Sequence, residues 1–180
     1  MSMTNKMIAA LRKEESIMAD VRIARIDNRY IHGQVAARIT KEFNISKIVL
    51  VDDVYAKNEM MKKIFLLAVI PGTTIDIVTV EDAVANMKAG KYERERTMLI
   101  WGNVDTAFRT YQAGWTFSEL NIGNLGGGPG RKQVDKSCYI DEKDAEQLKE
   151  LAQDGVEVVF QAMTDLPKTT LKEALKNTGL

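Results

Sequence analysis

The strongest constraint on the fold of this chain is a regular alternation between short apolar runs and segments with helical periodicity. The run Lys47–Val51 reads KIVLV and has four consecutive apolar residues, which is typical of a strand covered on both faces. Similar runs predict further strands at 21–26, 75–80, 97–101, 119–122, 137–140 and 156–162. Helical patterns lie between them at 34–43, 58–69, 82–88, 104–113, 142–153 and 169–176.

This order of strands and helices predicts an α/β fold, a three-layer, mostly parallel open sheet of about six or seven strands with helices on both faces. The 180 residues show no linker, tandem repeat or compositional break after position 20, so residues 21–180 are predicted to form a single domain. Ligands of such sheets bind in the crevice at the carboxyl ends of the strands. The loops that leave those ends lie at 27–33, 52–57, 102–105 and 123–131.

Residues 1–20 are predicted to be an N-terminal extension, either disordered or a translated leader. They do not resemble a secretory signal, because the apolar stretch Met7–Leu11 is short and charged residues follow it. Purine-rich codons for Lys13–Glu15 would resemble a bacterial ribosome-binding site, and Met18 follows at a suitable distance. We therefore expect Met18 to be the true start, which the nucleotide sequence tests.

Composition argues against several kinds of partner and cofactor. The chain has 25 Lys and Arg against 25 Asp and Glu, whereas a nucleic-acid-binding domain normally carries a basic excess, so no nucleic acid is expected. The longest apolar run, Ile64–Ile70, is far shorter than the roughly 18 residues that a membrane-spanning helix needs. Cys138 is the single cysteine and cannot form an internal disulfide, and no Cys/His cluster exists for zinc. We predict no metal and no cofactor.

The segment 27–34, which reads DNRYIHGQ, carries the chemistry of the sequence. It runs from the end of the first predicted strand into the first helix, where unpaired backbone N–H groups and the helix dipole favour an anion. Arg29 offers a guanidinium that can grip two phosphoryl oxygens. Asp27 can orient the imidazole of His32 or position the arginine. The phosphate-contacting positions of the loop are predicted to be Asn28, Gly33 and Gln34.

His32 is the only histidine of the chain and the candidate nucleophile. A neutral imidazole nitrogen attacks phosphorus near pH 7 and forms a labile P–N bond. Phosphoryl transfer needs in-line positioning and neutralised charge, which Arg29 and the helix N-terminus can supply without a metal. Spacing alone leaves open that His32 is merely a polar helix cap. The ring nitrogen that reacts depends on what the other nitrogen contacts.

Asp27–Val35 resembles the phosphorylation-site loop of a known family, the IIB components of the bacterial phosphoenolpyruvate-dependent sugar phosphotransferase system, mannose/fructose/sorbose class. The loop of that family reads Asp-x-Arg-Leu-Ile-His-Gly-Gln-Val, and this chain reads DNRYIHGQV. The resemblance continues through Val49–Asp53, Leu120–Asn124 and Gly155–Gln161. Tyr30 stands where the family has leucine, and Gly126–Pro129 departs from the family pattern after the preceding asparagine.

The resemblance implies a transferase that takes a phosphoryl group from the phosphohistidine of a IIA protein onto His32. It then passes the group to a sugar that arrives through the membrane-embedded IIC and IID subunits. In this scheme Arg29 is the phosphate clamp, Asp27 is the orienting partner, and backbone groups around Gly33 add hydrogen bonds. The protein would be cytoplasmic and held at the inner face of the plasma membrane by its partners. The identity of the sugar and the formation of a homodimer are left open.

Asp52 and Asp53 end the second strand, so they support an alternative function, a receiver-like signalling module phosphorylated on one of them. A structural role, in which they cap the next helix or bond loop amides, is the preferred interpretation. A third reading is an inert nucleotide-binding or regulatory domain. Asp52, Asp53, Asn121 and Gly123 are predicted to line the active crevice, and Gly123–Gly130 to form a loop at its wall.

Overall fold

The computed structural model describes residues 19–180, and at 34–36 it describes the backbone but not the side chains. The predicted extension, leader and alternative start at Met18 therefore lie outside the described residues, apart from Ala19 and Asp20. The first strand begins at Asp20, one residue before the predicted domain boundary.

Strands and helices alternate along most of the described chain. The strands are β1 (Asp20–Asp27), β2 (Lys47–Val51), β3 (Thr74–Val78), β4 (Arg96–Trp101), β5 (Glu119–Asn124), β6 (Lys132–Asp135), β7 (Cys138–Ile140), β8 (Glu157–Phe160) and β9 (Thr169–Thr170). The helices are α2 (Gly33–Glu42), α3 (Glu59–Ala68), α4 (Val80–Lys88), α5 (Val104–Gln112), α6 (Glu142–Gln153) and α7 (Leu171–Leu175), with a short 3-10 helix η1 (Tyr55–Lys57).

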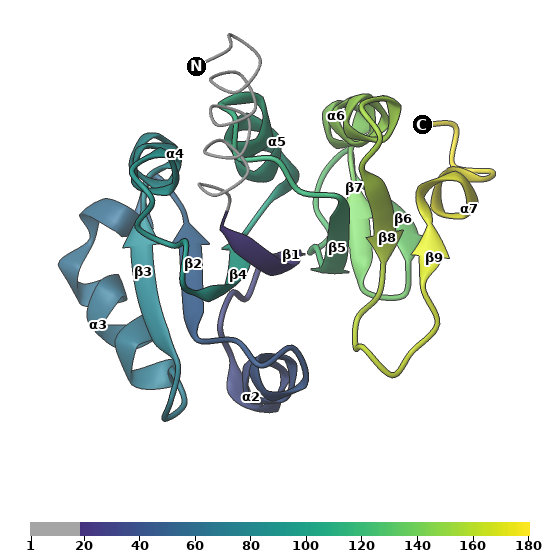
Figure 1. The fold of residues 1–180 in the computed structure, drawn as a ribbon. Coiled ribbons are helices and arrows are strands. Elements are labelled where there is room, and N and C mark those ends of the chain that lie inside the picture. The colour runs from purple at the N-terminus through teal and green to yellow at the C-terminus, as the bar shows by residue number, and fades with distance from the viewer. Residues whose placement is uncertain (1–18) are drawn as a thin grey trace, which may run out of the picture.

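Seven strands form one open sheet in the order β3-β2-β4-β1-β5-β8-β9. Its neighbouring strands are parallel, except for the edge pair β8 and β9. Helices α2 and α3 cover one face and α4, α5 and α6 cover the other, which gives three layers (Figure 1). The predicted fold class is confirmed.

The central strands are buried on both faces because successive side chains of a strand point to opposite sides. In β2, Ile48 and Leu50 join the apolar cluster under α2 and α3, while Val49 and Val51 join the cluster under α4, α5 and α6. The exposed fraction of each of these four side chains is 1% or less. This two-sided burial explains why the run KIVLV is continuously apolar.

Strand β1 lies at the point where the connections change faces. The chain leaves β1 through α2 on one face and leaves its neighbour β4 through α5 on the other. In an open parallel sheet this arrangement opens a crevice at the carboxyl ends of the two strands. The loop 27–33 leaves the carboxyl end of β1 and therefore lies at this edge of the sheet.

Strand pairing corrects two predicted boundaries and adds one strand. Strand β5 continues to Asn124 beside β1 and β8, so the first two residues of the predicted loop Gly123–Gly130 belong to the sheet. Strand β6 was not predicted, because KQVD has little apolar signal and becomes a strand only by pairing with β7. The last helix begins at Leu171 rather than 169, since Thr169 and Thr170 pair with β8 as strand β9.

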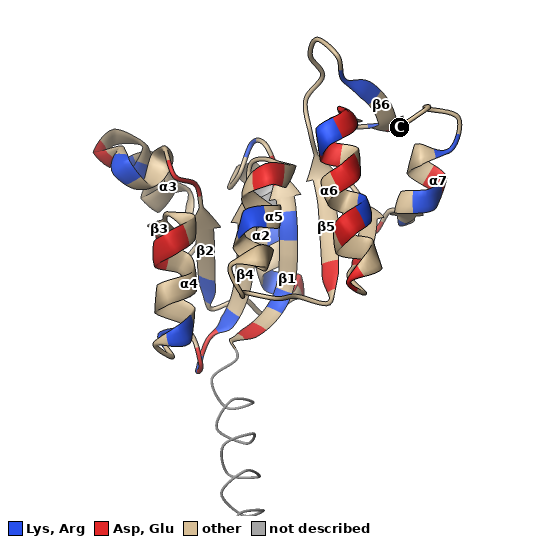
Figure 2. Ribbon diagram, turned by 90° about the horizontal axis from the view of Figure 1, so that it is seen from above, with Lys and Arg blue, Asp and Glu red and all other residues tan. Residues whose placement is uncertain are grey.

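Charged residues of both signs are distributed over α4, α6 and α7 (Figure 2). Arg25 and Asp27 of β1 differ from them, because both lie inside the fold with exposed fractions of 1%. Among residues 19–180, no helix is long and apolar enough to cross a membrane.

Candidate phosphate-accepting site

The site is built on a buried ion pair in β1. Arg25 and Asp27 are two residues apart in a strand, so their side chains point to the same face. The Arg25 Nη2 atom lies 3.2 Å from Asp27 Oδ2. Burial lowers the pKa of the Arg25 guanidinium, and the Asp27 carboxylate acts in the opposite direction. Each charge therefore makes burial of the other tolerable, and the carboxylate is held in one position.

Arg29 is bound to the same carboxylate. Its backbone N–H and its Nε donate to Asp27 Oδ1, each at 3.1 Å, and its Nη2 donates to Oδ2 at 3.3 Å. The first bond forms a turn in which an aspartate bonds the backbone two residues later. The Arg29 side chain is 49% exposed, whereas Asp27 is buried. Asp27 thus holds the Arg29 guanidinium on its buried side, and the rest of the Arg29 side chain is exposed to solvent.

His32 is the N-cap residue of α2, yet its side chain makes no capping hydrogen bond. Its ring Nε2 lies 3.5 Å from Asp27 Oδ2. That nitrogen is buried and has no hydrogen-bond partner among the described residues, although the His32 side chain as a whole is 27% exposed. One of the two ring nitrogens, Nε2, is therefore enclosed against the carboxylate.

The backbone next to His32 is open. Gly33 has φ +43° in the left-handed region that favours glycine, and a Cβ atom placed there would meet nothing within 4 Å. The first turn of α2 carries no acidic residue, so its N-terminus favours an anion. The side chain of Gln34 lies outside the described part of the chain. Asn28 is exposed, but its backbone N–H donates to Asn124 O at 3.1 Å and so extends the sheet.

The predicted crevice residues Asn121 and Gly123 lie behind the ion pair rather than at the surface. Asn121 is buried, accepts a hydrogen bond from Arg25 Nη1 and donates to Gln161 Oε1 at 3.1 Å. A Cβ atom at Gly123 would come within 1.7 Å of Arg25 Nη2. The glycine is therefore required because the arginine occupies the space beside it.

Arg25 is the site residue that sequence reasoning missed. It donates to the backbone oxygens of Gln161 at 3.2 Å and Ala162 at 3.0 Å, in addition to its contacts with Asn121 and Asp27. A signal was present, because a charged residue stands within an apolar central strand, two positions before an aspartate. Such a residue needs a partner on the same face.

Asp52 and Asp53 use their oxygens to hold neighbouring segments. Asp52 Oδ1 accepts from the backbone N–H groups of Val54 at 2.9 Å and Tyr55 at 2.7 Å. Asp53 accepts from the Val80 N–H at 2.9 Å and pairs with Arg109 at 2.9 Å. Desolvation alone would raise the pKa of Asp53, but the Val80 N–H and Arg109 outweigh it and lower that pKa. These contacts support the structural interpretation of both aspartates.

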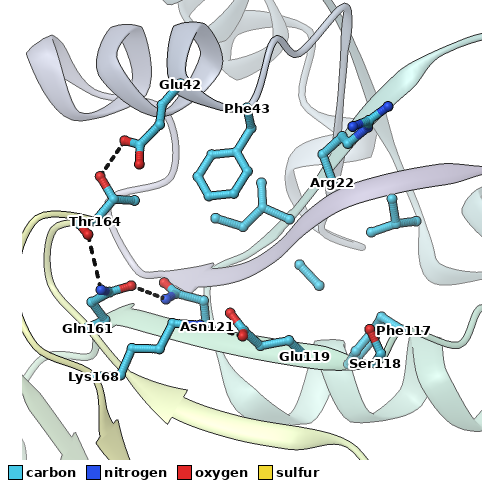
Figure 3. Close-up of a pocket in the computed structure, with 13 residues that line it drawn as sticks. Arg22, Glu42, Phe43, Phe117, Ser118, Glu119, Asn121, Gln161, Thr164 and Lys168 are labelled. Atoms are coloured by element: carbon cyan, nitrogen blue, oxygen red, sulfur yellow. Dashed lines mark hydrogen bonds and ion pairs between the residues drawn. The ribbon is translucent and has the colours of Figure 1, made fainter.

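A cavity of 320 Å³ lies between the first half of β1, the end of α2 and the loop after β8 (Figure 3). Asn121 and Gln161 line it and bond to each other. Because these two residues also bond Arg25, the cavity lies behind the Arg25–Asp27 pair, whereas His32 follows the other end of β1. It is distinct from the crevice at the carboxyl ends of the strands.

Metal-ligating side chains do not gather in the described structure. Among residues 19–180, no group of three or more His, Cys, Asp or Glu side chains lies close enough to hold a metal ion. The positive charge around His32 comes instead from Arg29 and from the N-terminus of α2. That the site works without a metal stays a prediction.

The fold and the site define an open α/β domain in which a short loop leads from the central strand β1 to a histidine at the N-terminus of a helix. The chain belongs to the family described as PTS system sorbose subfamily IIB component, whose model matches residues 21–179. It is therefore a IIB component of the sugar phosphotransferase system, of the sorbose and mannose type.

Individual relatives agree with this family. The chain is 34% identical over 153 residues to the PTS system mannose-specific EIIAB component of Escherichia coli K12, a match that covers 85% of the chain and 47% of the relative. The chain spans about half the length of the mannose-specific relatives that it matches. It is 28% identical over 159 residues to the sorbose-specific EIIB component of Klebsiella pneumoniae, covering 88% of the chain and 97% of the relative.

Solved structures show the same architecture. The IIBSor domain of the sorbose permease from Klebsiella pneumoniae superposes with a TM-score of 0.84 at 28% identity, covering 88% of this chain and 98% of that one. The manxB protein of Thermoanaerobacter tengcongensis superposes with a TM-score of 0.78 at 32% identity, covering 87% and 95%.

Proposed function

We propose that this chain carries a phosphoryl group on His32. It accepts the group from a phosphorylated IIA protein and passes it to a sugar transported by membrane IIC and IID subunits. The observation that carries the proposal is the placement of His32, with Nε2 against the buried Asp27 and the rest of the ring at the open N-terminus of α2. Arg29 is the phosphate clamp, and the backbone from Asn28 to Gln34 surrounds the incoming oxygens.

The accepting nitrogen is Nδ1, because Nε2 is enclosed against Asp27. The Nδ1 lone pair attacks phosphorus, the P–N bond of the donor phosphohistidine breaks, and its electron pair returns to the donor imidazole. The proton on Nε2 of His32 faces the Asp27 carboxylate, which stabilises the positive charge that the ring gains. In the second transfer a sugar hydroxyl attacks phosphorus, its proton is released, and the P–N bond electrons return to Nδ1.

Arg29 and the helix N-terminus neutralise the charge that spreads over the phosphoryl oxygens during transfer. The guanidinium is held by Asp27 before the donor arrives, so it needs little reorganisation. The absence of a side chain at Gly33 leaves the N-terminal amides of α2 accessible. These groups do for the phosphoryl group what a metal ion does in other phosphotransferases.

The test is incubation with labelled phosphoenolpyruvate, the general phosphotransfer proteins and a IIA protein, followed by analysis of the labelled chain. A P–N bond survives base and fails in acid, whereas an acyl phosphate is destroyed by base and by hydroxylamine. Because the chain has one histidine, an acid-labile, base-stable label identifies His32 without further mapping. His32→Gln should abolish the label. A hydroxylamine-sensitive label would instead support phosphorylation of Asp52 or Asp53, and no label would support an inert domain.

The reacting nitrogen has its own measurement. Nuclear magnetic resonance of imidazole-labelled phosphoprotein separates the two ring positions, and we expect phosphorus on Nδ1. Phosphorus on Nε2 would require the ring to leave Asp27, and would contradict the assignment while leaving His32 as the carrier.

The domain boundary and the location form part of the same proposal. Residues 21–180 are the phosphotransfer domain, and a chain that starts at Met18 should accept phosphate at the same rate as the full chain. The protein works in the cytoplasm, where its partners hold it at the inner face of the membrane.

A further inference from the structure

Tyr30 has an unusual place in the phosphate-accepting loop. Its φ angle is +55°, in the left-handed region that residues with a side chain rarely adopt. Its backbone N–H donates to Asp27 O at 2.8 Å, and its hydroxyl donates to Asp52 Oδ2 at 2.5 Å. Its ring packs edge-on against Tyr55 and Phe65, with centroid separations of 5.3 and 5.6 Å. The conformation is thus fixed at the backbone, at the ring and at the hydroxyl.

The Tyr30 hydroxyl also lies against the residues that directly follow two other strands. A Cβ atom at Gly102, directly after β4, would lie 2.1 Å from the Tyr30 hydroxyl oxygen, and its three nearest atoms all belong to Tyr30. Asp52, directly after β2, accepts the hydroxyl proton. The tyrosine therefore ties the loop after β1 to the ends of β2 and β4, at the point where the connections change faces.

Only Ile31 separates Tyr30 from His32, and the Ile31 side chain is buried under α2 and α3. Two residues with fixed side chains, Tyr30 and Ile31, therefore directly precede His32 in the chain. His32 is followed by Gly33, the first residue of α2, and a Cβ atom at Gly33 would meet nothing within 4 Å. The backbone before His32 is thus fixed through Tyr30 and Ile31, and the His32 ring lies against Asp27.

We propose that Tyr30 is a positioning residue for phosphoryl transfer, and that its hydroxyl bond to Asp52 holds the His32 loop in its reactive geometry. The inference rests on the proposed function of His32. A leucine, which the resembling family has at this position, can pack against Tyr55 and Phe65 but cannot donate to Asp52.

The test compares Tyr30→Phe with Tyr92→Phe. Tyr92 makes the matching bond to Asp76 Oδ2 at 3.1 Å, far from His32 in the sheet, so its loss controls for the stability of a tyrosine–aspartate bond. We expect both variants to fold and lose similar stability in urea. Only Tyr30→Phe should slow labelling by phospho-IIA, by about tenfold in kcat with KM unchanged, because positioning of the nucleophile is disturbed.

Equal labelling rates for wild type and Tyr30→Phe would overturn the inference while leaving His32 as the carrier. If the wild type itself is not labelled on histidine, the proposed function fails first, so the two failures are distinguishable. Labelling that falls equally in Tyr30→Phe and Tyr92→Phe would reveal a general loss of folding and would also overturn the inference.

A second pair of variants tests the crevice contact. Gly102→Ala places a methyl group against the Tyr30 hydroxyl and should slow labelling to a similar extent. In a Tyr30→Leu background the obstructing atoms are gone, so Gly102→Ala should cause no further loss. An equal effect of Gly102→Ala in both backgrounds would show that Gly102 matters for another reason, and would contradict the proposed contact.

Discussion

The loops after β1 and β2 begin alike, but their aspartates bind different groups. Both leave the carboxyl ends of parallel strands, and both start with a carboxylate. Asp27 is buried, and its side chain holds Arg25, Arg29 and the ring of His32. Asp52 and Asp53 are more exposed, and they accept hydrogen bonds from backbone N–H groups, from the Tyr30 hydroxyl and from the exposed Arg109.

The difference shows that position at the carboxyl edge does not by itself make a reactive site. In the first loop a buried carboxylate organises side chains around an open helix N-terminus. In the second loop the carboxylates satisfy backbone donors, so they have little capacity left for a ligand. Asp27 thus positions other charged side chains, whereas Asp52 and Asp53 fix the conformation of neighbouring backbone segments.

The largest expected difference between the loops is in stability. Asp27→Asn leaves the Arg25 guanidinium buried without its counter-charge, and we expect a loss of about 3–5 kcal/mol in the free energy of unfolding. Asp53→Asn removes a surface interaction and should cost less than about 1 kcal/mol. Urea unfolding of the two variants measures both values. Equal losses would contradict the contrast drawn between the buried and the exposed carboxylate.

The next difference concerns Arg29 and Arg109, the arginines bound to Asp27 and Asp53. Arg29→Ala should slow His32 labelling by about 100-fold, because a charge-stabilising donor is lost from the transition state, while the fold is kept. Arg109→Ala, the matched change at the partner of Asp53, should leave labelling unchanged. Initial rates of label incorporation and a circular dichroism spectrum check each variant. Unfolding of Arg29→Ala would mark that residue as structural.

A smaller effect is expected behind the first loop. Gly123→Ala forces a methyl group toward Arg25 and should cost about 1–3 kcal/mol, the usual range for overpacking. Gly127→Ala is the control, because a Cβ atom there meets Tyr139 only at an ordinary contact of 3.5 Å. Thermal unfolding compares the two. A tolerated Gly123→Ala would show that Arg25 can move without loss, and would weaken its role as a fixed support.

The smallest effect concerns pH and the charges next to Asp53. A hydrogen bond from Lys143 is the main influence that lowers the pKa of Asp105, to about 2, with Gln147 and Arg109 adding to it. The pKa of Asp105 is lower in the folded protein than in the unfolded protein, so its ionised carboxylate stabilises the fold at any pH above the unfolded pKa. This contribution is lost as the pH falls through the pKa of the folded protein. Because the side chains of Asp105 and Lys143 are 38% and 69% exposed, solvent screens the pair, and we expect the loss to be below about 1 kcal/mol.

Urea unfolding between about pH 5 and pH 2 measures this loss. Asp105→Asn should reduce the slope of stability against pH in that window, and His32 labelling at neutral pH should not change. An unchanged slope would mean that the pair with Lys143 contributes nothing in solution.

The sequence predicted the fold class and the central strands well, because these depend on local apolar patterns. It placed Asp27, Arg29 and His32 in one loop, and the structure brings the three together. It did not reveal β6 or β9, since these strands exist through pairing with distant partners rather than through their own composition. It also placed Asn121 and Gly123 at a crevice surface, although both are buried against the Arg25 guanidinium.

The sequence by itself determined the order of strands and helices, the single histidine and its place at a helix start, because these follow from residue type and periodicity over short spans. Only the tertiary structure decided which carboxylate faces the imidazole, which glycine accommodates a guanidinium, and that Tyr30 bonds Asp52. Those facts join residues 5 to 98 positions apart. Such contacts depend on the register of neighbouring strands, which no local pattern encodes.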